Sequence, residues 1–318
     1  MREIHATLVA GDGHPLAAML YQPPRPLAAV QINPATGAAR GYYRAYARFL
    51  AERGFAVLCY DYRGIAGSRW HAAEPQQLTM RNWGERDAAA ALDWLQAQHP
   101  HLPLLAVGHS VGGQLLGLMP NNERLSGALT IAAQCGYWRH WPRRLQPLLA
   151  AVWHVGVPLA VAATGRLPAA LLGVELPGGV AREWARWCRH RDFIVDARGR
   201  PLRDGFERFR GRLRMYAIAD DPFYAPQAAV EALARCYRNA EVELRRIEPR
   251  QHGVAAIGHF GFFRSSMPRA AWEETADWLR AVVLSLSSPL HPRAAPSSSA
   301  ARAGDGPVAA EQAYPSTA

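Results

Sequence analysis

The pattern Gly-x-Ser-x-Gly at residues 108–112 constrains the fold of this 318-residue chain more than any other feature. It follows the apolar run 102–107 and precedes the helical pattern 111–118, so it joins a buried strand directly to a helix. A turn this tight strains the backbone of the serine and admits only small residues beside it. We therefore predict a sharp strand-to-helix turn that presents Ser110.

Apolar runs and helical patterns alternate along most of the chain. The strand-like segments are 3–9, 16–21, 27–32, 55–60, 102–107, 125–133, 213–219 and 242–247, and the helix-like segments are 42–53, 82–98, 111–118, 226–237 and 269–286. The first two strands are separated by a Gly-Asp-Gly turn, which is typical of a hairpin. The later strands are apolar throughout, which indicates a parallel sheet buried on both faces. We predict an α/β fold with a mostly parallel central sheet and helices on both faces.

The alternation stops between residues 136 and 210. This stretch holds five tryptophans, and 13 arginines against six acidic residues, so it is both aromatic and basic. We interpret it as a helical lid inserted into a core that consists of residues 1–135 and 211–286. Residues 287–318 are rich in Ala, Ser and Pro, and we expect them to form a disordered, low-complexity tail.

The serine at position 110 needs a base if it is to act as a nucleophile. An acid at the end of a late strand and a histidine in the last loop would complete a catalytic triad in the order Ser, acid, His. Asp220 and Asp221 end the strand 213–219, while His252 and His259 lie in the loop before the last helix. We predict Ser110, His259 and Asp221 as nucleophile, base and orienting acid. Asp220 and His252 are the alternatives.

An anionic intermediate at Ser110 needs two backbone N–H donors. The first is expected from Val111, which follows the serine, and the second from the loop after the strand 27–32. That loop reads Asn-Pro-Ala-Thr-Gly, and proline has no N–H to donate. The second donor is therefore Ala35 or Thr36.

Composition narrows the classes of partner. The chain carries a net charge of +10, and all its basic residues are arginine. Since no nucleic-acid-binding motif accompanies the charge, we interpret it as a solvated surface and expect no nucleic-acid partner. The four cysteines form no C-x-x-C motif, so we expect no metal site and no cofactor.

The same composition bears on the compartment. Buried free thiols suit a reducing cytoplasm, and the N-terminal residues lack the apolar stretch of a signal peptide. The apolar stretch 145–163 comes closest to a membrane span, but we expect His154, Gly156 and Pro158 to interrupt it. We therefore predict a cytoplasmic protein without stable membrane insertion. The sequence does not indicate an oligomeric state.

Three segments together resemble a bacterial group of α/β hydrolases related to serine aminopeptidase-like and monoacylglycerol-lipase-like enzymes. They are Asp-Tyr-Arg-Gly-Ile-Ala-Gly-Ser at 61–68, Gly-His-Ser-Val-Gly-Gly at 108–113 and Gly-His-Phe-Gly-Phe-Phe-Arg at 258–264. The resemblance covers about residues 1–285 and implies the α/β-hydrolase fold with the triad named above. Members of the group commonly have Gly-x-Gly where this chain has Ile-Ala-Gly at 65–67, so the shape of that loop is not implied.

These residues predict hydrolysis of an ester or thioester of a small or medium acyl group through an acyl-enzyme intermediate. The predicted partner is a small-molecule acyl substrate, held in a pocket that the tryptophans of the lid line. An acyltransferase would use the same triad, and the sequence does not distinguish a peptidase from an esterase. A non-catalytic ligand-binding homologue is the third alternative. The arginines of the lid add a lower-ranked hypothesis, an anionic substrate such as a coenzyme A thioester or a phospholipid.

Overall fold

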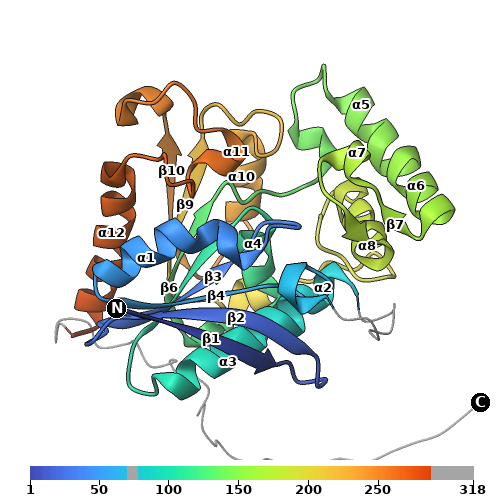
Figure 1. Cartoon of the computed structure of the whole chain (residues 1–318). Helices are drawn as coiled ribbons and strands as arrows, with labels where there is room; N and C mark the ends of the chain where they lie inside the picture. Colours follow the sequence, from blue (N-terminus) through green and yellow to red (C-terminus); the bar gives the residue numbers. More distant parts are fainter. Residues whose placement is uncertain (70–77, 288–318) are drawn as a thin grey trace, which may run out of the picture. The chain divides into compact units, whose positions relative to one another are not determined.

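An eight-stranded sheet organises the molecule, with strand order β1-β2-β4-β3-β5-β6-β9-β10 (Figure 1). The computed structural model describes residues 1–69 and 78–287. The strands are β1 (Arg2–Val9), β2 (Pro15–Gln22), β3 (Ala28–Asn33), β4 (Phe55–Tyr60), β5 (Leu104–His109), β6 (Leu125–Ile131), β9 (Arg212–Ile218) and β10 (Glu241–Ile247). The β1–β2 and β2–β4 pairs are antiparallel and all other pairs are parallel. The predicted hairpin and parallel sheet are thus confirmed.

Helices cover the sheet because its central strands are apolar on both sides. Every residue of β3, β4 and β5 is buried, which requires cover on both faces. The covering helices are α1 (Arg44–Glu52), α2 (Met80–Asn82) with the π-helical η4 (Trp83–Ala88), α3 (Ala89–Gln98), α4 (Val111–Gln114), α10 (Gln227–Ala234) and α12 (Arg269–Ser287). The α1 and α12 helices are linked by a 2.8 Å hydrogen bond between the hydroxyls of Tyr46 and Thr275.

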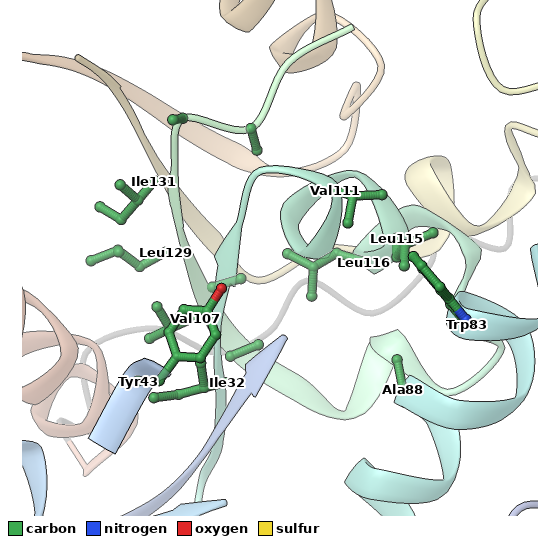
Figure 2. Close-up of a cluster of buried hydrophobic side chains, with 14 of the residues drawn as sticks. Ile32, Tyr43, Trp83, Ala88, Val107, Val111, Leu115, Leu116, Leu129 and Ile131 are labelled. Carbon is green, nitrogen blue, oxygen red and sulfur yellow. The ribbon is translucent and has the colours of Figure 1, made fainter. Parts of the chain in front are cut away.

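The core beside β5 is filled by apolar side chains from strands and helices. Figure 2 shows Ile32, Val107 and Leu129 of three neighbouring strands, with Leu116 and Trp83 on the helical side. Burying one such aliphatic side chain stabilises the fold by about 1.5–3 kcal/mol. This packing fixes the end of β5, and so the start of the turn at 108–112.

A buried charged cluster holds the loop that follows β4. Arg63 is fully buried and bonds Asp12 of the β1–β2 turn and Asp87 of η4, each at 2.7 Å. The loop continues as a tight 3-10 turn at Ala66–Ser68, where Ala66 has a φ of 41°. This is the turn at which the sequence departs from the Gly-x-Gly pattern. The Asp61 carboxylate stabilises this turn by accepting the Gly67 N–H at 3.1 Å.

Residues 136–210 connect β6 to β9 and are mostly helical. They comprise α5 (Gln146–Ala151), the π-helical η8 (Val152–Gly156), α6 (Val157–Thr164), α7 (Ala169–Leu172), α8 (Gly178–Arg189) and α9 (Asp204–Arg208), with the short strands β7 (Arg166–Leu167) and β8 (Leu176–Pro177). Figure 1 shows α5, α6, α7 and α8 grouped together. Since Met1–Leu286 forms one compact unit, the division into core and lid stays a prediction.

The predicted interruption of the apolar stretch is wrong. The stretch forms one helix, Gln146–Thr164, long and apolar enough by length and composition to cross a membrane, although only 22% of it is buried. A π-helical turn contains His154 and Gly156, and Pro158 follows it directly, so the missing N–H of the proline falls where the regular hydrogen-bond ladder is already interrupted. Near the C-terminus, α12 continues to Ser287, the first residue of the expected low-complexity tail. The remaining tail residues, 288–318, lie outside the described residues.

Candidate active site

Ser110 sits at the sharp turn between β5 and α4, with φ 52° and ψ −119°. This is the left-handed side of backbone space, which a residue with a side chain adopts only under strain. The neighbouring glycines are required by close approach. A Cβ at Gly112 would lie 2.1 Å from the backbone oxygen of Asn33, and one at Gly113 would lie 2.5 Å from the Ala133 Cβ. The turn therefore packs directly against the end of β3.

Asp221 and His259 form a buried pair beside the serine. Asp221 follows β9, and His259 lies in the four-residue helix α11 (Gly258–Gly261). Their contact, from His259 Nδ1 to Asp221 Oδ2, measures 2.6 Å. The second carboxylate oxygen accepts the N–H of Tyr224 at 3.1 Å. A carboxylate at Nδ1 keeps the proton on that nitrogen, so that Nε2 is free to accept one.

Ser110 and His259 line the same cavity. Within the described chain no hydrogen bond joins the Ser110 hydroxyl to the imidazole of His259. Such catalytic hydrogen bonds are often long without substrate and shorten in the reacting complex. The arrangement allows a proton to pass from the serine to Nε2 once an acyl group holds both side chains in place.

The two alternative residues have other contacts. Asp220 accepts the backbone N–H of Ile257 at 2.8 Å and of Gly258 at 3.0 Å, so it ties the end of β9 to the start of α11. His252 ends the 3-10 helix η9 (Pro249–His252) and does not line the cavity. The structure brings together Ser110, Asp221 and His259, and leaves Asp220 and His252 outside this group.

The candidate oxyanion donors differ in their partners. The N–H of Ala35 donates to the hydroxyl of Tyr43 at 2.7 Å, which occupies it. Thr36 lies next in the same loop, and both Ala35 and Thr36 line the cavity with Ser110. Val111 follows the serine at the start of α4. These contacts favour Thr36 over Ala35 as the second donor beside Val111.

A buried chain of hydrogen bonds continues from Tyr43 to His259. The backbone carbonyl of His259 can only accept, so His109 Nε2 carries the ring proton and donates it there at 2.9 Å. The opposite nitrogen, Nδ1, therefore accepts the proton of the Tyr43 hydroxyl, also at 2.9 Å, and that hydroxyl accepts the Ala35 N–H. Burial, together with the charge of the nearby His259, lowers the pKa of His109 well below its usual value, which keeps this ring neutral.

The cavity beside Ser110 has a volume of about 280 Å³ and a largely apolar wall. Trp141, Trp153 and Trp184 of the 136–210 stretch line it, whereas Trp187 is buried elsewhere and bonds the Val195 carbonyl. The other apolar lining residues are Ala35, Leu149, Leu171, Leu172, Val174, Cys188, Phe223, Tyr224 and Phe260. Among residues 1–69 and 78–287, no cluster of three His, Cys, Asp or Glu side chains could hold a metal ion.

Comparison with known proteins bears on the fold and on the class of protein. A family model described as serine aminopeptidase, S33, matches residues 24–174. A lipase in its open form is 19% identical with a TM-score of 0.62, and the alignment covers 89% of this chain and 99% of the lipase. The chain is an α/β hydrolase.

Two further solved structures share the fold of this hydrolase. A carboxyl esterase from Bacillus coagulans is 16% identical with a TM-score of 0.57, covering 89% of this chain and 99% of the esterase. A proline iminopeptidase from Mycobacterium smegmatis is 13% identical with a TM-score of 0.58, covering 89% and 100%. No curated protein sequence matches this chain. The predicted family resemblance and fold are confirmed, and at these identities the solved structures establish the fold alone.

Sequence reasoning missed the contacts of Tyr43 and His109 in this hydrolase. His109 stands inside the Gly-x-Ser-x-Gly pattern, which predicts no contacts for this position. Its partners lie 66 and 150 positions away in the chain, so no local pattern reveals them. The one available signal was the presence of an imidazole at a position that must be buried under the turn.

Proposed function

We propose that this α/β hydrolase cleaves an ester or thioester through Ser110, His259 and Asp221. The observation that carries the proposal is the 2.6 Å contact between His259 Nδ1 and Asp221 Oδ2, made by an imidazole that lines the same cavity as Ser110. A strained serine after a buried strand, beside an oriented imidazole, is the arrangement that acyl transfer requires.

In the first half-reaction the Ser110 oxygen attacks the acyl carbonyl, and His259 Nε2 takes the hydroxyl proton. The Asp221 carboxylate stabilises the resulting imidazolium, and the N–H groups of Val111 and Thr36 bind the oxyanion. The intermediate collapses when the bond to the leaving oxygen or sulfur breaks, and His259 returns the proton to that atom. Water then repeats the sequence on the acyl-serine and releases the carboxylic acid.

The experiment is a series of p-nitrophenyl esters of graded chain length, together with labelling by a fluorophosphonate probe. Ser110→Ala should abolish labelling and lower kcat by several orders of magnitude, as for other serine triads. Ser126→Ala, a serine within β6, is the matched control and should label normally. A folded Ser110→Ala protein that keeps wild-type activity would overturn the assignment. If wild-type protein neither labels nor turns over any ester, the chain is a ligand-binding homologue.

The acid and the base are tested by paired substitutions. Asp221→Asn should remove most of the turnover, whereas Asp220→Asn should act mainly on stability, since Asp220 holds the backbone of Ile257 and Gly258. His259→Ala should abolish turnover and His252→Ala should leave most of it. The reverse order within either pair contradicts the proposed triad.

We further propose that residues 136–210 act as a lid that forms the acyl pocket. Support comes from the apolar wall, to which this stretch contributes three tryptophans. Trp153→Ala enlarges the cavity and should shift kcat/KM towards longer acyl chains. Trp138→Ala, in the same stretch but outside the lining, is the control. Equal chain-length profiles for the two variants contradict the proposal.

We propose a cytoplasmic location for the enzyme. All four cysteines are free, and Cys59, Cys135 and Cys188 are buried, which suits a reducing compartment. Fractionation of cells that express the full chain tests this. Recovery of the protein outside the cytoplasm contradicts it.

A further inference from the structure

The helix Gln146–Thr164 has two apolar faces with different surroundings. On the inner face, Leu149 and Trp153 line the cavity of Ser110, and Val157 continues the row fully buried. On the outer face, Leu148 and Leu159 are 54% and 63% exposed. The helix contains no charged residue in its 19 positions.

The outer face is a continuous stripe. It is formed by exposed residues at helical spacing, namely Leu148, Ala151, Val155, Leu159 and Ala162. Leu171 of α7 also lines the cavity and is 36% exposed. A helix that faces water ordinarily carries charged side chains on its outer side. This stripe therefore has the composition of a surface that is covered in use.

The charged side chains that precede the helix are all positive. No aspartate or glutamate occurs between Glu123 and Glu175. Arg139, Arg143 and Arg144 precede the helix and are exposed, and none of them forms an ion pair with a described residue. A covering surface must therefore tolerate apolar contact and supply negative charge.

We propose that the stripe and these three arginines dock on an anionic phospholipid surface. The helix would lie in the plane of the interface with its outer face among the acyl chains and the arginines at the headgroups. A membrane span does not fit, because the inner face packs on the cavity wall. A second copy of the chain fits less well, because a two-fold interface would bring the unpaired arginines of both copies together.

The docked orientation deepens the proposed function and rests on it. Leu171 lines the cavity, is partly exposed and lies beside Gly156 of the helix, so an acyl group leaving the lipid layer would have an apolar path to Ser110. The substrate class would then be esters with a lipid acyl chain.

The test is flotation of the full-length Ser110→Ala protein with vesicles, in which no lipid is consumed. Vesicles of equal parts phosphatidylcholine and phosphatidylglycerol should bind it, and vesicles of phosphatidylcholine alone should bind it less. The double variant Leu148→Glu/Leu159→Glu should lower the partition coefficient at least about tenfold. Arg143→Ser/Arg144→Ser should lower it about fivefold for each arginine, and added salt should remove this difference.

Matched controls carry the same changes elsewhere. Leu244 on β10 and Leu284 on α12 are 46% and 61% exposed, so Leu244→Glu/Leu284→Glu adds equal charge away from the stripe. It should float like the parent. Circular dichroism verifies that every variant is folded.

Three results would overturn the docking proposal. They are absence of binding to the mixed vesicles, equal losses in the control and the stripe variants, and a dimer in sedimentation that Leu148→Glu/Leu159→Glu dissociates. Hydrolysis of soluble p-nitrophenyl acetate by protein with Ser110 intact is measured separately. If this ester is not hydrolysed, the proposed function is contradicted. Vesicle binding by the Ser110→Ala protein tests the docking proposal alone, because it does not require hydrolysis.

Discussion

Removing one hydroxyl, by Tyr43→Phe, should disturb the active site without touching the cavity. The ring of Tyr43 packs against Phe263 at 5.0 Å between centroids, and phenylalanine keeps this packing. The lost oxygen leaves the Ala35 N–H and the Nδ1 of His109 without partners. Tyr43 and His109 are fully buried and Ala35 is 1% exposed, so water does not readily replace the contacts.

The magnitude follows from these two groups. An unsatisfied buried donor or acceptor costs about 1–3 kcal/mol, so the loss of two partners should lower the free energy of unfolding by about 2–6 kcal/mol. The loop that carries Thr36 and the backbone of His259 both lose an anchor. We expect kcat to fall roughly tenfold, less than the 10²–10³ that follows loss of an oxyanion donor itself. KM should change little, because Tyr43 does not line the cavity.

Tyr46→Phe is the matched control. Tyr46 lies three positions along and is equally buried, but its hydroxyl contacts Thr275 at 2.8 Å, far from the reacting groups. The Thr275 hydroxyl still bonds the Trp272 carbonyl, so this variant should lose about 1 kcal/mol and keep its kcat. Urea denaturation and steady-state hydrolysis of a p-nitrophenyl ester measure both quantities. If both variants lose stability but keep the same kcat, the buried chain does not position His259 and the reasoning is refuted.

Three other predictions concern the scaffold, and urea denaturation measures each of them. Arg63→Met removes the cation that faces the fully buried Asp87 carboxylate, while Asp12 keeps its ion pair with Arg86, and it should lower the free energy of unfolding by about 3–5 kcal/mol; a loss below 1 kcal/mol would contradict the buried cluster. Gly112→Ala places a Cβ 2.1 Å from a β3 backbone oxygen, and should cost about 1–3 kcal/mol or more. Gly41→Ala, with no atom within 4 Å, should stay within about 0.5 kcal/mol of wild type, and equal effects at the two glycines would contradict the close packing. Burial lowers the pKa of His109, so below about pH 6.5 this imidazole binds a proton in the unfolded chain but not in the folded one. The free energy of unfolding should therefore fall as the pH drops below about 6.5, by up to about 1.4 kcal/mol per pH unit. His109→Gln should flatten this slope.

The sequence predicts those features that depend on local spacing. The turn at Ser110 follows from the glycines next to the serine, and the succession of strands and helices along the chain follows from short apolar runs. Both signals act within a few residues. His259 was placed by chain order, although the short helix α11 around it was not expected. The Tyr43–His109–His259 contacts depend on packing between distant segments, and no local pattern contains them.

The apolar helix shows the opposite limitation. His154, Gly156 and Pro158 were expected to interrupt the apolar stretch, and each of them also weakens a helix when considered singly. In the folded chain the inner face of the helix is buried against the cavity wall, and this packing outweighs local propensity. A π-helical turn absorbs the irregularity, so the helix continues through all three residues.

The pairing of β6 with β9 has a consequence for how such a chain can change over evolutionary time. These strands are parallel neighbours, and the Ala132 N–H still bonds the Tyr216 carbonyl where the chain leaves the sheet. The connection between them therefore starts and ends at fixed points that the sheet itself holds. Lengthening a connection between fixed points costs little, about 0.6 kcal/mol for each doubling of a flexible loop. Descendants can thus exchange the whole 136–210 stretch for another of different size while the strand register, and the residues that follow β5 and β9, stay unchanged.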